Sequence, residues 1–367
     1  VFSGGYTADG AYWIDQTSGT WITSTFYASK LPEWVERFNS QRRADKYWDL
    51  DWKDASGKVL RQTGRTPQSK FYEVVGETPF ATEYQLEFAR ELITQEKLGS
   101  GTATDLLVVS LSSMDILGHK VGPDGPELQE FIVDLDRRLA EFFAFLGRQI
   151  GLANIWIALS SDHGTSAIPA EARKLRIPAA SMSNPQMRKQ LNAELSAQLG
   201  AGEYVAEVRG AQVYLSSEAF TRLKMDQTQA EGTVGEALLR AGMRASFTKS
   251  QLARGEVPPG EIGQRYLNSY SPHSGWYVLA LPPPFQIAVT QSTHGSAYTY
   301  DRRVPLALFG LPFQPGQYRN EVEPVDLAVT LASLLGINAP AAAQGRVLTE
   351  ALAQRATPSA QVSGAGR

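Results

Sequence analysis

The chain has 367 residues, of which 43% are hydrophobic and 20% are charged, and its formal net charge is -3. These values describe a globular protein of one large domain, or of a domain with an insertion, without the basic field that binds nucleic-acid polymers. The absence of cysteine excludes disulfides, thiolate ligands and a cysteine nucleophile within the sequence. No apolar run approaches the roughly 20 residues that a membrane span needs.

The first hundred residues predict a hairpin followed by helices. Residues 7–15 and 19–27 look like two strands joined by a polar turn. An amphipathic helical pattern covers residues 31–38, and residues 79–98 predict a second helix. The aromatic stretch at 47–52 is interpreted as buried packing and not as a platform on which bases stack.

The most regular pattern comes next. Residues 105–111 form a continuous apolar run, as expected of a strand buried on both faces of a parallel sheet, and residues 154–159 form another. Between them, residues 127–147 have apolar side chains at helical spacing and predict the crossover helix. Each strand is followed shortly by an aspartate and a histidine, at the sheet edge where open α/β folds bind their ligands.

From residue 165 the pattern changes to short, mixed elements. We expect helices at 185–199 and near 232–241, with a hairpin-like pair of strands at 204–216. This composition resembles an inserted cap more than a continuation of the sheet, and three consecutive prolines mark its return.

The chain then resumes the pattern of the core. Residues 304–310 predict a strand, and residues 324–335 predict a helix that Gly336 stops. The expected fold class is α/β, with a central, largely parallel sheet flanked by helices and an inserted cap subdomain. The expected parts are the catalytic core 1–164, the cap 165–286, the C-terminal part of the core 287–356 and a mobile tail 357–367.

Three of the four histidines stand beside acidic or hydroxyl-bearing residues, and this clustering is the functional signal. Imidazole and carboxylate groups together suit zinc and similar divalent ions. Without cysteine, any metal must be held by nitrogen and oxygen. The candidate ligands, enough for one metal site and most of a second, are Asp115, His119, Asp162, His163 and His294.

Each motif also has a purely structural interpretation. Asp115 and His119 alone could be an exposed pair on a helix, and Asp162-His163 alone could belong to a cap and turn after a strand. Together, with strand ends before two of the three motifs, they favour a metal site. The fourth histidine, His273, is interpreted as a loop residue.

The order of these motifs resembles that of the alkaline phosphatase superfamily. The segments that carry the resemblance are Asp115-Ile116-Leu117-Gly118-His119, Ser161-Asp162-His163-Gly164 and Thr293-His294-Gly295-Ser296. The opening segment from Gly5 to Trp13 and the segment from Leu31 to Trp34 look closest to the monomeric secreted alkaline phosphatases, which are relatives of the nucleotide pyrophosphatase/phosphodiesterases. The resemblance covers nearly the whole chain.

This resemblance implies an alkaline phosphatase-like fold with two zinc ions at the carboxyl end of the sheet. Asp115, His119 and His294 match three ligands of the first ion, and Asp162 and His163 match two ligands of the second. The family completes the second site with an aspartate and a nucleophilic Thr or Ser. We expect these, and the Lys and Arg that contact the substrate phosphate, in a segment before the first residue of this chain.

The implied function is a two-zinc phosphohydrolase that cleaves small phosphate monoesters through a phospho-Thr or phospho-Ser intermediate, in the periplasm or outside the cell. Alternatives are a phosphodiesterase/nucleotide pyrophosphatase, a manganese-dependent phosphoglycerate mutase, or a processed fragment that binds metal without turnover. We expect on the order of 150–200 residues before Val1, about one further domain's worth. That N-terminal fragment of the same gene product is the expected partner.

Overall fold

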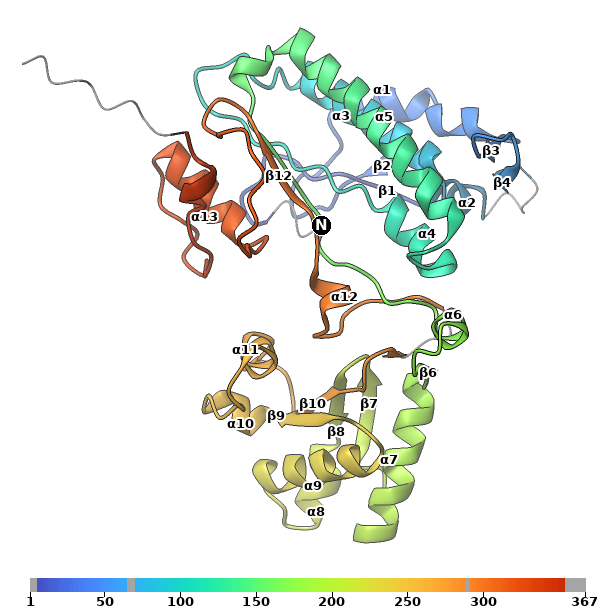
Figure 1. Ribbon diagram of the computed structural model, residues 1–367, viewed down its shortest axis with the longest axis vertical. Coiled ribbons are helices and arrows are strands. Elements are labelled where there is room, and N and C mark those ends of the chain that lie inside the picture. Colours follow the sequence, from blue (N-terminus) through green and yellow to red (C-terminus); the bar gives the residue numbers. More distant parts are fainter. Residues whose placement is uncertain (1–4, 65–69, 288–290, 354–367) are drawn as a thin grey trace, which may run out of the picture. The chain divides into compact units, whose positions relative to one another are not determined.

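The computed structural model describes residues 5–64, 70–287 and 291–353 (Figure 1). Short sheets flanked by helices confirm the predicted α/β class. The chain divides into two compact units: the first contains Val1–Glu96, Leu106–Glu141 and His163–Arg303, and the second contains Lys97–Asp105, Phe142–Asp162 and Val304–Arg367. The predicted boundaries of core and cap stay predictions, and the predicted tail, 357–367, lies outside the described residues.

The N-terminal part of the first unit is mainly helical. Its elements are β1 (Trp13–Ile14), β2 (Trp21–Ile22), α1 (Glu33–Ser40), β3 (Asp51–Lys53), β4 (Val59–Gln62), α2 (Phe71–Gly76), α3 (Pro79–Gln95), α4 (Ser113–Val121) and α5 (Pro126–Gln149), the last of which runs on into the second unit. β1 pairs with β2 and β3 pairs with β4, both antiparallel. The predicted hairpin therefore exists, although its paired strands are only two residues long.

Aromatic side chains form the core of this part. The rings of Trp21 and Phe88 stack with their centroids 3.8 Å apart, and Phe38 meets Phe88 edge-on. Within the stretch 47–52, Tyr47 and Trp52 are buried as predicted, but neighbouring side chains remain exposed. The core thus comes from α1 and α3 together with β2, because each turns its apolar face toward the others.

The rest of the first unit consists of short elements. They are α6 (Pro169–Lys174), β6 (Ala180–Ser181), α7 (Asn184–Leu199), β7 (Val205–Arg209), β8 (Gln212–Leu215), α8 (Ser217–Arg222), α9 (Gln227–Arg240), β9 (Ala245–Thr248), α10 (Lys249–Ala253), α11 (Glu261–Asn268), β10 (Tyr277–Leu281), β11 (Gln286–Ile287) and α12 (Thr299–Arg302). Four of the strands form an antiparallel sheet in the order β7-β8-β10-β9. The helices α7 and α9 lie against this sheet and bury a continuous apolar cluster (Figure 1).

Capping decides where these helices begin. α7 starts after Ser183, which forms a capping box with Gln186, in agreement with the predicted helix at 185–199. α9 starts after Asp226, which forms a capping box with Gln229, so the helix begins five residues before the predicted start at 232. The capping residues therefore mark the start better than the apolar spacing does.

The second unit contains β5 (Ile157–Ser160), β12 (Leu306–Phe309) and α13 (Asp326–Leu335). β5 and β12 pair antiparallel, with Leu306 opposite Ser160. α13 ends at Gly336, whose φ of 68° is the left-handed conformation that commonly terminates helices. The predicted strands and helix of this part are thus present, but the strand pair is antiparallel.

The prediction of a buried strand at 105–111 is wrong for the described residues. This segment pairs with no other described strand, and Leu106 and Val108 are 81% and 53% exposed. Among the described strands only β6 and β11 pair in parallel. An apolar run predicts that a strand can be buried, but burial also needs a neighbouring strand, and no described strand pairs with this segment.

A partly buried ion-pair network connects α3 with α5. The guanidinium group of Arg138 is buried and donates hydrogen bonds to the carboxylates of Glu83 and Asp134. Burial alone raises the pKa of Glu83, but the hydrogen bond and charge of Arg138 outweigh burial, so the pKa of Glu83 is lowered overall. A carboxyl group whose pKa is lowered by folding stabilises the folded state when it is ionised.

We therefore expect the substitution Glu83→Gln to destabilise the protein at pH 7 by about 1 kcal/mol, a low value because 35% of the Glu83 side chain is exposed. The difference from the unchanged protein should shrink as the pH falls below the unfolded-state pKa of about 4.3 toward the lower folded-state value. Thermal unfolding at several pH values measures this. Glu141→Gln is the matched control. The Glu141 side chain pairs with Arg137 but is 55% exposed, so this substitution should change the stability little. A difference that stays constant down to pH 3 would contradict the ion pair.

Candidate metal centre

The helix α4 presents two of the predicted ligands on one face. Asp115 and His119 are four residues apart, which places them one above the other on the same side of a helix. On another side, Leu117 is fully buried and belongs to an apolar cluster with Trp52 and Phe131. Packing of Leu117 therefore fixes the rotation of the helix and, with it, the direction of the carboxylate and the imidazole.

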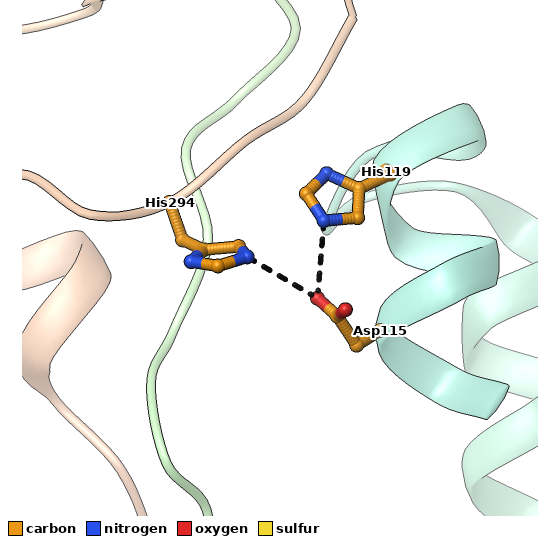
Figure 2. A group of neighbouring side chains, drawn as sticks. All are labelled: Asp115, His119 and His294. Carbon is orange, nitrogen blue, oxygen red and sulfur yellow. Dashed lines mark ion pairs between the residues drawn. The ribbon is translucent and has the colours of Figure 1, made fainter. Parts of the chain in front are cut away.

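The loop after β11 brings a third ligand to this face. Asp115 Oδ1 lies 3.5 Å from His119 Nε2 and 3.8 Å from His294 Nε2, and Figure 2 shows both imidazoles turned toward the carboxylate. One ligand atom from each of the three residues lies within 4.8 Å of the others. Ligand atoms about 2.0–2.2 Å from a tetrahedral zinc ion are roughly 3.3–3.6 Å apart. The observed distances between the three ligand atoms are thus close to those around a bound zinc ion.

Backbone carbonyl groups orient two of the histidines. His119 Nδ1 lies 3.0 Å from the carbonyl oxygen of Ser292, and His163 Nδ1 lies 2.8 Å from that of Gly164. A carbonyl oxygen can only accept, so each Nδ1 donates its proton, and in the neutral ring the lone pair is therefore on Nε2. This is the usual arrangement around metal-binding histidines, in which a second hydrogen bond fixes the tautomer and the ring.

His163 lies beside the three-residue group. Its ring stacks on that of His294, with the centroids 3.4 Å apart and the planes inclined by 12°. Burial, followed by the neighbouring His163, lowers the pKa of His294, although the charge of Asp115 acts in the opposite direction. A lowered pKa keeps the imidazole neutral, and the neutral form is the one that binds metal ions.

The fifth predicted ligand, Asp162, is outside the three-residue group. It follows the end of β5 by two residues and belongs to the second unit, whereas His163 belongs to the first. The carboxylate has the hydroxyl of Ser161 as a neighbour at 3.5 Å. Its sequence position next to His163 keeps the two Cα atoms about 3.8 Å apart.

Two loops that carry histidines are joined by hydrogen bonds. Ser166 N donates to the carbonyl of Thr293 at 2.8 Å, and Ser292 Oγ donates to the carbonyl of Ser166 at 2.6 Å. The hydroxyl of Thr165 is engaged in the same junction, 2.7 Å from Ser292 Oγ. These contacts hold the segment after His163 beside the segment before His294, although 126 residues or more separate their partners in sequence.

Ser292 and Asp301 were not predicted as part of the site. Ser292 acts through its backbone carbonyl, which any residue type provides, so its identity carries no signal for that role. Asp301 is buried on α12, and burial raises the pKa of its carboxyl group against the effect of hydrogen bonds from Ser296. An aspartate directly after the stretch Tyr298-Thr299-Tyr300 is a weak signal, because charged residues are seldom buried without a specific reason.

The group remains partly open to solvent. The side chains of Asp115, His119 and His294 are 40%, 36% and 30% exposed. A metal site with three protein ligands and an accessible side can accept a further ligand such as a substrate oxygen. His273 is exposed in the turn after α11 and is not in this group, which agrees with its interpretation as a loop residue.

Comparison with known proteins places this geometry in a family. The family model of type I phosphodiesterase / nucleotide pyrophosphatase matches residues 2–228. Alkaline phosphatase PhoV of Synechococcus elongatus is 29% identical over 96% of this chain and 68% of its own length. A protein of Myroides odoratus named calcium-transporting ATPase is 29% identical over 96% of this chain and 70% of its own length.

A solved structure has the same fold. The crystal structure of alkaline phosphatase PafA superposes with a TM-score of 0.86 and 25% sequence identity, over 96% of this chain and 72% of that one. The chain therefore belongs to the type I phosphodiesterase / nucleotide pyrophosphatase family, within the alkaline phosphatase superfamily. The predicted resemblance is confirmed, and with it the chain's place among hydrolases of phosphate esters. No helix in the described part of the chain is long and apolar enough to cross a membrane.

Proposed function

We propose that this chain carries most of the metal centre of a two-zinc phosphohydrolase that cleaves phosphate monoesters. The observation that carries the proposal is the convergence of Asp115, His119 and His294, which come from a helix and a loop far apart in the sequence. The alkaline phosphatases among the relatives support the monoester reaction. Both relatives are alkaline phosphatases by name, and the reaction is proposed for this chain on that basis.

The donor atoms suit zinc. Two imidazole nitrogens and one carboxylate oxygen are ligands that zinc accepts in catalytic sites, and manganese is a second candidate because it also takes oxygen and nitrogen. A bound zinc ion would neutralise charge that develops on the phosphoryl oxygens. The contribution of the chain is geometric: Leu117 fixes α4, and the carbonyl of Ser292 holds the His119 ring in the orientation that leaves Nε2 free to bind.

We propose His163 and Asp162 as two ligands of the second zinc ion. The stacking of His163 on His294 supports this assignment, since it brings the ring of a second-site residue against a ligand of the first site. Zinc pairs that act on phosphate esters are about 3.5–4 Å apart, a spacing that neighbouring rings can serve. Asp162 contributes negative charge from the adjacent sequence position.

The nucleophile of the proposed reaction is a Thr or Ser on a polypeptide segment outside this sequence. The hydroxyl of Thr165, two residues after His163, already shares hydrogen bonds with Ser292 and Thr293. Exposed apolar side chains such as Leu106 and Val108 give such a segment a surface to cover. The relatives are also longer than the part of them that this chain matches.

A second candidate function is hydrolysis of phosphodiesters or nucleotide pyrophosphates, which the description of the matching family favours. Phosphoglycerate transfer and metal binding without turnover are further outcomes of the same test. We propose a periplasmic or secreted location on the resemblance to secreted phosphatases.

The proposed function predicts about two zinc ions per chain and a higher kcat/KM for p-nitrophenyl phosphate than for bis-p-nitrophenyl phosphate in the complete gene product. Elemental analysis of the purified enzyme and steady-state rates on the two substrates measure this. A higher kcat/KM for the diester would contradict monoester hydrolysis and support hydrolysis of phosphodiesters or nucleotide pyrophosphates. Bound zinc without turnover of either ester would favour the non-catalytic alternative.

The position of the nucleophile predicts a difference between two preparations. The 367-residue chain alone should bind metal but show no turnover, whereas the complete gene product should form a phosphorylated Thr or Ser outside this sequence. Intact-mass measurement and mapping of the phosphopeptide after acid quench identify that residue. Hydrolysis of phosphate monoesters by a single folded species that begins at Val1 would refute the proposed placement.

A further inference from the structure

Asp301 connects the two loops that carry His163 and His294. One carboxylate oxygen of Asp301, Oδ2, accepts a hydrogen bond from the backbone N–H of Ser296 at 2.7 Å. The backbone carbonyl of the same residue accepts a hydrogen bond from the N–H of Gly164 at 2.6 Å. Ser296 is two residues after His294, and Gly164 directly follows His163. A single residue thus sets the distance between the two segments from which the stacked imidazoles project.

The junction has no spare room. A Cβ atom added to Gly164 would overlap the carbonyl oxygen of Tyr300, the residue before Asp301. The two loops therefore approach as closely as a glycine allows. Any change that pushes α12 away from Gly164 also changes the separation of the His163 and His294 rings, whose centroids are 3.4 Å apart.

The burial of Asp301 is costly for the fold. The residue is 4% exposed, and its second carboxylate oxygen, Oδ1, is buried without a hydrogen-bond partner among the described residues. A buried polar atom without a partner destabilises a protein, and a specific case in a native structure needs an explanation. The hydrogen bond from Ser296 offsets only part of this cost, because Oδ1 stays unpaired among the described residues.

We propose that Asp301 is a positioning residue that holds the loops of His163 and His294 at the separation required by a pair of metal ions. This inference rests on the proposed function, because it takes the two histidines as ligands of neighbouring ions. The carboxylate of Asp301 acts by accepting the hydrogen bond from Ser296 N–H, which fixes α12 against the loop of His294. The bond to Gly164 N–H comes from the backbone carbonyl of Asp301 and remains in every variant, so the substitutions test the carboxylate. The inference adds to the proposed site the residue that keeps the His163 loop and the His294 loop at a fixed distance.

The test compares Asp301→Ala and Asp301→Asn in the 367-residue chain. Zinc affinity is measured by competition with a chromogenic chelator, and hydrogen–deuterium exchange of the metal-free protein reports on residues 163–166 and 292–301. Asp301→Ala should weaken zinc binding about 10- to 100-fold, as loss of residues that orient ligands does. It should also speed exchange in both segments. Asp301→Asn should keep most of the affinity, because its amide oxygen can accept the same hydrogen bond.

The matched control is Asp326→Ala. Asp326 is also 4% exposed and accepts hydrogen bonds from the backbone N–H groups of Glu323 and Arg346, but it lies at the start of α13 in the second unit. The control should lower thermal stability and leave zinc affinity unchanged. Equal loss of affinity in Asp301→Ala and Asp326→Ala would overturn the positioning role, and so would equal loss in Asp301→Ala and Asp301→Asn.

The outcomes separate this inference from the proposed function. If the unchanged chain binds zinc and Asp301→Ala binds it equally well, the positioning role is wrong and the metal site stands. If the unchanged chain binds no zinc, the proposed function fails, and exchange in the metal-free protein still tests whether Asp301 holds the loops. Should Asp301→Ala not fold, Gly164→Ala perturbs the same junction from the other side. Normal zinc affinity in Gly164→Ala would overturn the inference.

Discussion

Replacing His119 by alanine in the complete enzyme is expected to remove the first zinc ion and to lower kcat/KM on the order of 100- to 1,000-fold. That loss corresponds to about 2.7–4 kcal/mol of transition-state stabilisation, the size measured when one group that stabilises developing charge is removed. The fold should persist, because the His119 side chain is 36% exposed and contributes little to the core. Elemental analysis, steady-state rates and thermal unfolding without metal measure the three effects.

The fourth histidine supplies the control for that experiment. His273→Ala removes an imidazole from an exposed turn that lies outside the three-residue group. It should leave zinc content and activity unchanged. Unchanged zinc content and activity in His119→Ala would contradict the site, and an equal loss in both variants would show that the effect does not come from ligation.

The substitution Asp162→Asn is expected to lower kcat/KM to a similar extent. It removes a negative charge but hardly changes the size of the side chain. An amide keeps the size of the carboxylate but lacks the negative charge that balances a divalent ion, so the second zinc should be lost. We expect a fall in kcat/KM on the order of 100-fold or more, about 2.7 kcal/mol. Residual zinc should approach one ion per chain, since Asp115, His119 and His294 remain.

Asp136→Asn is the matched control for Asp162→Asn. It makes the same chemical change at an exposed position of α5, outside the three-residue group. Zinc content and rates should stay at the level of the unchanged enzyme. Two bound zinc ions in Asp162→Asn would remove Asp162 from the second site, whatever the activity.

Local chemistry explains which parts of the site were predictable. The proximity of Asp115 and His119 could be predicted once a helix was expected there, because residues four apart share a face of a helix. His294 could be named because its residue type and neighbours suit metal binding. What the sequence could not show is that the loop of His294 lies against α4, because a contact between segments so far apart in the sequence depends on the packing of everything between.

The errors have physical reasons of the same kind. The run 105–111 has the composition of a buried strand, but Leu106 is 81% exposed because strand burial depends on partners elsewhere. The start of α9 was missed because the capping box of Asp226 and Gln229 lies before the apolar pattern begins. Asp301 was missed because its function comes from two backbone N–H groups, which the identity of Ser296 and Gly164 does not reveal.

The hydrogen-bonded junction of the two loops also bears on how the protein can evolve. Ser166 and Thr293 exchange hydrogen bonds, from N to carbonyl at 2.8 Å and from N to hydroxyl at 3.2 Å, so the chain leaves and returns at one place. The two ends of the long stretch between them are thus already joined. Insertions with adjacent ends can be lengthened, shortened or exchanged at little cost to the host structure. We therefore expect changes of length within the four-stranded sheet and its helices to leave the segments after His163 and before His294 joined.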